Sequence, residues 1–350
     1  MRIAQIAPLT EAVPPRLYGG TERVVSYLTE ELVGLGHEVT LFASGDSITT
    51  ARLEAIWPRA LRFETDLRDP FAAQMLLLET VRQRADQFDV LHFHLDYWSF
   101  SLFSRQRTPF LTTLHGRLDL PEYSPIYDQF RQVPLVSISD AQRRPLPLAN
   151  FVATVQHGLP EALLQPQPAK PSYLAFLGRI APEKRPDAAI LIARRAGIPL
   201  KIAAKVDRVD EAYYRDKIRP LIDGRHVELI GEIGDADKAE FLSGAIALLL
   251  PIEWPEPFGL VMIEAMACGT PVIAFNSGSV PEIIEDGLTG FIVENEVAAV
   301  AAIERAARLP RGRIRRRFEQ RFTSRRMAED YLRVYDELAE QPRPRLRVVT

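Results

Sequence analysis

The sequence has a single cysteine, no long apolar run and little net charge, and each scarcity excludes a class of protein. Because Cys268 is the only cysteine in 350 residues, no internal disulfide can form, which fits a reducing compartment such as the cytoplasm. The opening segment 1–8 is too short for a secretory or membrane-spanning segment. The formal net charge of −3 gives no broad basic surface for nucleic acid. We therefore expect a cytoplasmic protein that does not bind nucleic acid.

Motifs for common cofactors are also missing. No Gly-x-Gly-x-x-Gly occurs anywhere, which disfavours a nicotinamide or flavin enzyme. There are six histidines, and His92-x-His94-x-Asp96 has the spacing of a partial metal site. One strand end supplies only part of a coordination shell, and no second cluster of ligands follows in the sequence. We expect a reaction that uses neither a bound cofactor nor a metal.

What is present is a repeated alternation of strand and helix patterns. It occurs twice, as expected for an α/β protein with two doubly wound sheets. A proline-rich stretch at 159–171 separates the two sets. In the second set we expect strands near 173–177, 199–204, 227–230, 246–250 and 271–275. A last helix is expected over 324–339, with one apolar face made by Met327, Tyr331, Val334, Tyr335 and Leu338.

Two glutamates eight positions apart, Glu256 and Glu264, bracket the start of an apolar helix. Prolines at 255 and 257 disfavour helical geometry before them, so we expect the helix to begin near Phe258 and to end by Gly269. Glu256 then lies in the loop and Glu264 inside the helix. At a rise of ~1.5 Å per residue, Glu264 lies roughly 9 Å along the axis from Phe258.

The space between these two acids suits an elongated ligand. The unpaired N–H groups of Phe258, Gly259 and Leu260 favour an anionic middle part. A hydroxyl-rich group can meet Glu256, and Glu264 can accept both hydroxyls of a vicinal diol. A nucleoside diphosphate sugar has these three parts.

The segment from Glu256-Pro-Phe-Gly to Glu264-Ala-Met-Ala-Cys-Gly-Thr-Pro resembles the Glu-x7-Glu motif of retaining glycosyltransferases of the GT-B fold, and of family 4 in particular. The resemblance implies that Glu256 holds donor-sugar hydroxyls and that Glu264 holds the ribose. It implies two Rossmann-like doubly wound domains facing a cleft, with a C-terminal helix that crosses back to the N-terminal domain. We expect an acceptor-side domain at 1–160, a donor-binding domain at 161–325, and the returning helix and tail at 326–350.

A basic pair follows the first strand of the second set. Arg179 and Lys184 lie in Gly-Arg-Ile-Ala-Pro-Glu-Lys, between a strand and a helix. The carboxyl end of a strand is where open α/β sheets bind ligands. An arginine fork and a lysine charge suit diphosphate oxygens as negative charge builds on a leaving group. The Gly-Arg-x4-Lys element of family 4 implies the same role, and we expect both side chains to face solvent.

In the first set, the sequence has a glycine turn between a strand and a helix, at Gly19 and Gly20. By resemblance, this turn approaches the donor pyrophosphate. His115 follows the strand at 110–114, and the resemblance implies that it lies close to the donor sugar. His94 and Asp96 are expected to line the acceptor site. His157 stands where the family often has asparagine.

The resemblance implies retaining transfer of a hexose from a donor of the UDP-glucose or GDP-mannose type to a hydroxyl of a sugar, lipid or small molecule. Two alternatives stay open, a sugar-nucleotide epimerase of the same fold and a non-catalytic sugar-nucleotide-binding protein. The dense arginine run at 311–317 suggests either a solvated helix face or a weak membrane-surface contact.

Overall fold

The computed structural model describes residues 1–16 and 19–340. The chain divides into two compact units, one made of Met1–Gln156 with the segment from Ser324, and one made of His157–Thr323. The boundaries expected from the sequence, 160/161 and 325/326, lie a few residues C-terminal to the observed boundaries at 156/157 and 323/324. Leu17 and Tyr18 of the first loop and the tail from Gln341 lie outside the described residues.

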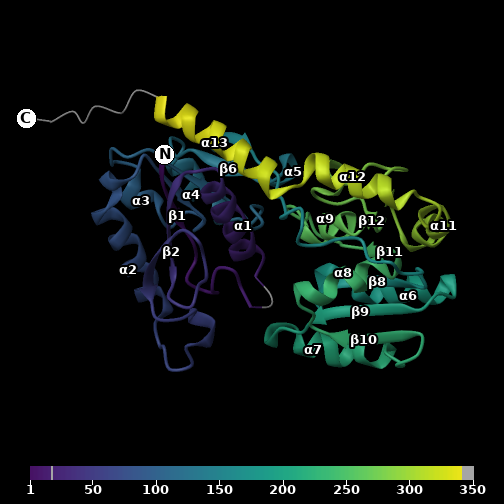
Figure 1. Ribbon diagram of the computed structural model, residues 1–350. Coiled ribbons are helices and arrows are strands. Elements are labelled where there is room, and N and C mark those ends of the chain that lie inside the picture. The colour runs from purple at the N-terminus through teal and green to yellow at the C-terminus, as the bar shows by residue number, and fades with distance from the viewer. Residues whose placement is uncertain (17–18, 341–350) are drawn as a thin grey trace, which may run out of the picture. The chain divides into compact units, whose positions relative to one another are not determined.

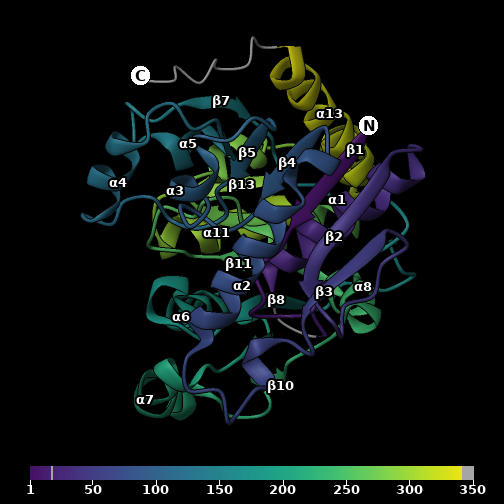
Figure 2. The same ribbon diagram turned by 90° about the vertical axis from the view of Figure 1, so that its left-hand side faces the viewer.

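The N-terminal unit is built on a parallel sheet. Within the described residues it has seven strands in the order β3-β2-β1-β4-β5-β6-β7, which Figure 2 shows side by side. Every pairing is parallel, so all carboxyl ends lie at one edge. The strands are β1 (Arg2–Ile6), β2 (Glu38–Ser44), β3 (Arg52–Trp57), β4 (Val90–Phe93), β5 (Phe110–Thr113), β6 (Leu135–Ser137) and β7 (Phe151–Thr154).

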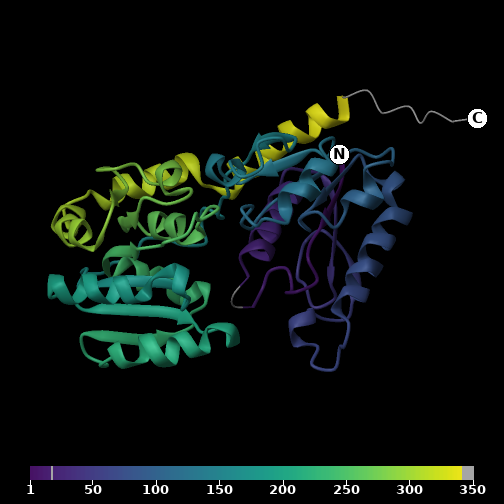
Figure 3. The ribbon, with the colours of Figure 1, turned by 180° about the vertical axis from the view of Figure 1, so that it is seen from behind.

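Helices cover both faces of this sheet, with α1 and α2 on opposite sides (Figure 3). The alternation of side chains along β1 explains the two faces: Ala4 and Ile6 join the core under α2, whereas Gln5 points to the face that carries the C-terminal helix. The helices of this unit are α1 (Gly20–Gly34), α2 (Pro70–Gln83), α3 (Phe100–Phe103), α4 (Tyr123–Gln129), α5 (Asp140–Arg143) and α13 (Ser324–Glu340).

The C-terminal helix α13 belongs to the N-terminal unit, as expected. It packs against α1 (Figure 1), and Gln5 Nε2 donates a hydrogen bond of 3.1 Å to Tyr335 OH. All five residues of its predicted apolar face are buried. The period of the sequence therefore predicted the buried face correctly.

The second unit is a parallel sheet with the strand order β10-β9-β8-β11-β12-β13 in the residues that the structure describes. The strands are β8 (Tyr173–Arg179), β9 (Leu200–Lys205), β10 (Val227–Gly231), β11 (Ala245–Leu250), β12 (Val272–Phe275) and β13 (Gly290–Val293). Five of them lie where the sequence predicted strands. The sequence analysis missed β13, which is short and begins with a glycine. A Cβ at Gly290 would lie 2.0 Å from the backbone oxygen of Val272, so the pairing with β12 needs glycine there.

Helices α6 and α11 share the core of this unit with the strands, and α12 packs on α9 (Figure 1). The helices are α6 (Pro186–Ala196), α7 (Glu211–Tyr213), α8 (Asp235–Ser243), α9 (Leu260–Ala267), α10 (Val280–Ile283), α11 (Glu296–Ala307) and α12 (Arg311–Arg321). Within residues 1–16 and 19–340, no helix is both long enough and apolar enough to cross a bilayer.

Each sheet reverses its strand order at one point, between β1 and β4 in the first unit and between β8 and β11 in the second. In open α/β sheets the loops at such a point diverge and leave a crevice for a ligand at the carboxyl ends of the strands. The residues singled out from the sequence lie at the ends of these strands or in the connections that follow them: Gly19, His94, Asp96, Lys184 and Glu256 in the connections, Gly20 at the start of α1, and Arg179 as the last residue of β8.

Candidate functional site

Helix α9 begins at Leu260, two residues later than the sequence suggested. The loop residue Gly259 precedes it with φ 77°. The N–H of Met262 bonds to the carbonyl of Gly259 at 3.0 Å, so the N–H groups directed out of the helix start are those of Leu260 and Val261. Glu264 then lies about 6 Å along the axis from Leu260, at ~1.5 Å per residue.

The loop that carries Glu256 is fixed by close backbone packing. Gly278, which follows β12, approaches so closely that a Cβ there would lie 2.3 Å from the backbone nitrogen of Glu256. The next residue, Ser279, donates from its N–H to the carbonyl of Glu256 at 2.9 Å and from its hydroxyl to the carbonyl of Phe258 at 2.9 Å. Phe258 itself is 2% exposed and meets the ring of His157 edge-on at 4.9 Å. Phe258 can therefore offer a ligand only its backbone.

Glu256 is held by two side chains. Lys184 Nζ forms an ion pair with its Oε2, and Trp254 Nε1 donates to the same oxygen at 2.9 Å. The Lys184 ammonium also lies 4.8 Å from the centroid of the Trp254 ring, within the range of a cation–π contact. The carboxylate is 10% exposed, and its other oxygen is not used by these contacts. The sequence-predicted residues Lys184 and Glu256 are thus brought together directly.

Glu264 is the more deeply buried acid. It is 4% exposed, and its Oε1 accepts a hydrogen bond of 2.7 Å from Lys238 Nζ. Lys238, on α8, also lies 3.2 Å from Asp235. A buried carboxylate is stable only with a charged or hydrogen-bonded partner, and Lys238 is that partner for Glu264.

Arg179, the last residue of β8, lies among carboxylates. It pairs with Glu183, and its Nη1 lies 3.5 Å from Asp210 and 3.7 Å from Asp207. The expectation that Arg179 and Lys184 both face solvent is wrong, since their side chains are only 25% and 19% exposed. The physical reason is that nearby acids form ion pairs with both cations.

In the N-terminal unit, the sequence-predicted histidines meet at the carboxyl ends of β4 and β5. His94 Nδ1 lies 2.8 Å from His115 Nε2, and His94 Nε2 lies 2.8 Å from Gln5 Oε1. Burial lowers the pKa of His115 to about 3, so the ring is neutral at physiological pH. His94 is 3% exposed with both nitrogens engaged. That His94 lines the acceptor site remains a prediction.

Asp96 and Gly19 both have backbone geometry that is unusual for most residues. Asp96 has φ 49°, and burial raises the pKa of its carboxyl to about 6. Gly19 has φ 155° and precedes α1; a Cβ there would lie 2.8 Å from Pro15. Gly20 is exposed at the start of that helix. In the described part of the chain, no group of three His, Cys, Asp or Glu side chains could hold a metal ion.

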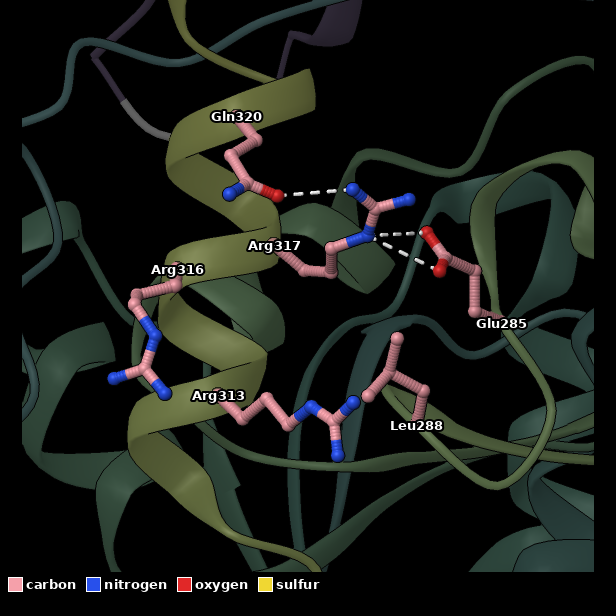
Figure 4. Close-up of a pocket in the computed structure, with 6 residues that line it drawn as sticks. All are labelled: Glu285, Leu288, Arg313, Arg316, Arg317 and Gln320. Carbon is pink, nitrogen blue, oxygen red and sulfur yellow. Dashed lines mark hydrogen bonds and ion pairs between the residues drawn. The ribbon is translucent and has the colours of Figure 1, made fainter.

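The arginine run on α12 is structural in part and exposed in part. Arg315 is 7% exposed and donates to the backbone carbonyls of Glu161, Leu164 and Ala267. Three other arginines line a surface pocket of about 360 Å³ together with Glu285, Leu288 and Gln320 (Figure 4). In that pocket Arg317 bonds to Glu285 and Gln320, while Arg313 extends toward Leu288. None of the lining residues belongs to the Glu256–Glu264 motif.

Comparison with known families agrees with this geometry. The family model "Glycosyltransferase Family 4" matches residues 18–187, and "Glycosyl transferases group 1" matches residues 165–325. The chain belongs to glycosyltransferase family 4. A phosphatidyl-myo-inositol mannosyltransferase of Mycobacterium leprae is 25% identical to this family 4 chain over 378 aligned residues, covering 97% of each.

Solved structures show the fold of this family 4 enzyme. A sucrose-phosphate synthase of Thermosynechococcus elongatus matches with a TM-score of 0.78 at 22% identity, covering 96% of this chain and 98% of that one. Anabaena HepE in complex with UDP-glucose matches with a TM-score of 0.71 at 16% identity, covering 96% of this chain and 100% of that one. The fold is therefore the GT-B class, as the sequence predicted. The family matches and the curated relative, rather than these structures, support glycosyltransferase activity.

Several residues that support the site of this family 4 enzyme were missed in the sequence. Lys238 follows Asp235 by three positions and precedes Leu242 by four, so the three residues share one face of α8. A lysine on the same helix face as an apolar residue was the signal available in the sequence. Trp254 stands two residues before Glu256, and a tryptophan beside a loop carboxylate could have indicated its hydrogen bond. Ser279 and Gln5 gave no signal that distinguishes them from ordinary polar residues.

Proposed function

We propose that this protein transfers a hexosyl group from a nucleoside diphosphate sugar to an acceptor hydroxyl with retention at the anomeric carbon. The observation that carries the proposal is the arrangement around the start of α9, where Glu256 and Glu264 bracket outward N–H groups and are each held by a lysine. In this arrangement Glu264 receives the ribose diol, the N–H groups receive the diphosphate, and Glu256 receives hydroxyls of the sugar.

The reaction breaks the bond between the anomeric carbon and the phosphate oxygen, and the bonding electrons go to the diphosphate. Arg179 and Lys184 stabilise the charge that develops there, after they exchange their carboxylate partners for phosphate oxygens. The acceptor oxygen bonds to the same face of the anomeric carbon, and its proton passes to the leaving diphosphate. Two cations at this position allow the reaction to proceed without a metal ion.

The residues of the N-terminal unit take the roles that the family resemblance implies. His115 contacts the donor sugar, Gly19 and Gly20 approach the pyrophosphate, and Asp96 serves the acceptor. The pKa of about 6 for Asp96 lets its carboxyl carry a proton in part of the population near neutral pH, so that it can donate as well as accept a hydrogen bond. The single buried cysteine supports a cytoplasmic location.

The first tests use two nucleotide-sugar donors and one class of acceptor. The UDP-glucose complex of HepE favours UDP-glucose, and the mannosyltransferase of Mycobacterium leprae favours a mannose donor and an acceptor built on inositol. Thermal-shift measurements with UDP and GDP identify the base, because a ligand at 100 times its Kd stabilises the folded state by about 2.7 kcal/mol. The matched control is Glu264→Gln, which should lose most of the shift.

Activity is then measured as nucleotide release with the chosen donor and candidate acceptors. NMR of the product gives the anomeric configuration. An inverted product would refute retention, and donor turnover in the absence of acceptor, with a changed sugar configuration, would show an epimerase. Donor binding without either reaction would show a binding protein.

A further inference from the structure

A buried chain of polar side chains connects the C-terminal helix to His115. Tyr335 on α13 accepts a hydrogen bond from Gln5 Nε2 at 3.1 Å, Gln5 Oε1 lies 2.8 Å from His94 Nε2, and His94 Nδ1 lies 2.8 Å from His115 Nε2. Tyr335 and Gln5 are fully buried and His94 nearly so. Buried polar groups of this kind keep their geometry because an unmade hydrogen bond is costly there.

The Gln5 amide gives this chain a direction. Its oxygen can only accept, so His94 Nε2 carries a hydrogen. A neutral imidazole, which burial favours, has one N–H, so His94 Nδ1 accepts the hydrogen of His115 Nε2. The lone pair of His115 is then on its Nδ1. One amide orientation in the core therefore selects the tautomer of a histidine at the carboxyl edge of the sheet.

A second branch of hydrogen bonds meets the same amide. The Tyr335 hydroxyl lies 2.7 Å from His92 Nδ1, and His92 Nε2 lies 2.7 Å from Thr113 Oγ1. With Gln5 Nε2 donating to Tyr335, the hydroxyl donates to His92 Nδ1, and His92 Nε2 donates to Thr113. If the amide were turned around, its oxygen would face the Tyr335 oxygen and His92 Nδ1, and each hydrogen in the branch would have to reverse.

We propose that His94, held by Gln5 and by Tyr335 of the C-terminal helix, is a positioning residue that fixes the tautomer and ring orientation of His115. This inference rests on the proposed function, in which His115 contacts the donor sugar. It gives α13 a role in the reaction, because the hydroxyl that bonds to the amide comes from that helix. A positioning role for His94 also accounts for its burial directly after the carboxyl end of β4.

The test uses the intact protein and four variants, with His115→Gln as a fifth variant for NMR assignment. His94→Leu removes both ring nitrogens, whereas His94→Asn keeps an oxygen near the position of Nδ1. Tyr335→Phe removes only the hydroxyl on α13. Tyr127→Phe is the matched control, because Tyr127 is equally buried in the same unit and its hydroxyl has no hydrogen-bond partner among the described residues. Thermal melts confirm that each variant is folded.

The first readout is the tautomer of His115, measured by long-range proton–nitrogen NMR correlations on protein labelled at histidine and assigned with His115→Gln. We expect a hydrogen on Nε2 in the unaltered protein and in Tyr127→Phe, and a mixture of tautomers in His94→Leu. The second readout is kinetic. Loss of an outer hydrogen-bond partner of a functional histidine typically costs about 10- to 100-fold, so His94→Leu should lower kcat by that factor with little change in donor KM.

Partial recovery of kcat in His94→Asn and a smaller loss in Tyr335→Phe are also expected. The proposal is overturned if His115 carries its hydrogen on Nδ1 in the unaltered protein, or if its tautomer is the same in His94→Leu. It is also overturned if His94→Leu and Tyr335→Phe keep full kcat in an active enzyme. Failure of the proposed function is recognised separately: no donor would then be turned over by the unaltered protein, while the NMR result still decides whether the relay exists.

Discussion

The ion pair between Lys238 and Glu264 gives a sharp test of how the donor site is built. The change is Lys238→Met, which keeps most of the side-chain volume and removes the ammonium group. Glu264 is 4% exposed and accepts 2.7 Å from Lys238 Nζ, so the variant leaves a buried carboxylate without its cation. Removing one partner of a buried pair costs about 3–5 kcal/mol. Asp235 adds little, because its side chain is 30% exposed.

The expected loss of folding stability can be measured as a fall in melting temperature. The unit that contains both residues spans His157–Thr323, a size for which 1 kcal/mol shifts Tm by roughly 2–4 °C. We therefore expect the transition of this unit to fall by about 6–20 °C in Lys238→Met. The matched control is Lys217→Met, an exposed lysine of the same unit, which should change the free energy of unfolding by less than about 0.5 kcal/mol.

A double-mutant cycle separates stability from donor binding. In Lys238→Met with Glu264→Gln the uncompensated charge is gone, so most of the stability should return, with a coupling of about 2–3 kcal/mol. Donor KM should stay raised in the double variant, because an amide replaces the carboxylate that we propose accepts both ribose hydroxyls. Calorimetry and steady-state kinetics measure the two effects. An unchanged Tm in Lys238→Met, or additive losses in the cycle, would refute this account of the buried pair.

Three further predictions concern the reaction and its pH dependence. Activity should survive EDTA, because Arg179 and a neighbouring lysine supply the cations for the diphosphate; complete loss with rescue by Mg²⁺ or Mn²⁺ contradicts this. Glu264→Ala should mainly raise donor KM, by about 10- to 100-fold, whereas His115→Ala should mainly lower kcat. The reverse pattern would mean that the donor lies in the opposite orientation, with its sugar at Glu264 and its ribose at His115. Asp96→Asn should stabilise the protein above pH 6 by up to about 3 kcal/mol, because a carboxyl whose pKa is raised from 3.8 to about 6 destabilises the folded state when ionised. That gain should shrink as pH falls through 6 and disappear below about pH 3, where Asp96 is protonated in both the folded and unfolded states, and melting curves across this range would expose a pH-independent gain as a failure of the argument.

Much of the architecture followed from local patterns. Alternating strand and helix periods predicted two doubly wound sheets, and the spacing of apolar residues predicted the buried face of α13. Prolines and glycines around Glu256 and Glu264 predicted a loop followed by a helix, although α9 begins two residues late. These features depend on interactions within a few residues, so the order of residue types is enough to predict them.

The tertiary structure alone decided which side chains support the site. Gln5 and Tyr335 lie 330 positions apart, and His92 and Tyr335 lie 243 apart. The lysine that holds Glu264 comes from another helix. The sequence indicates that charged and polar side chains need partners when they are buried. The parallel crossover connections of the fold determine which partners meet. The sequence therefore determined the candidate acids and histidines, whereas packing determined that lysines hold the acids and that a tyrosine on the last helix reaches the histidines.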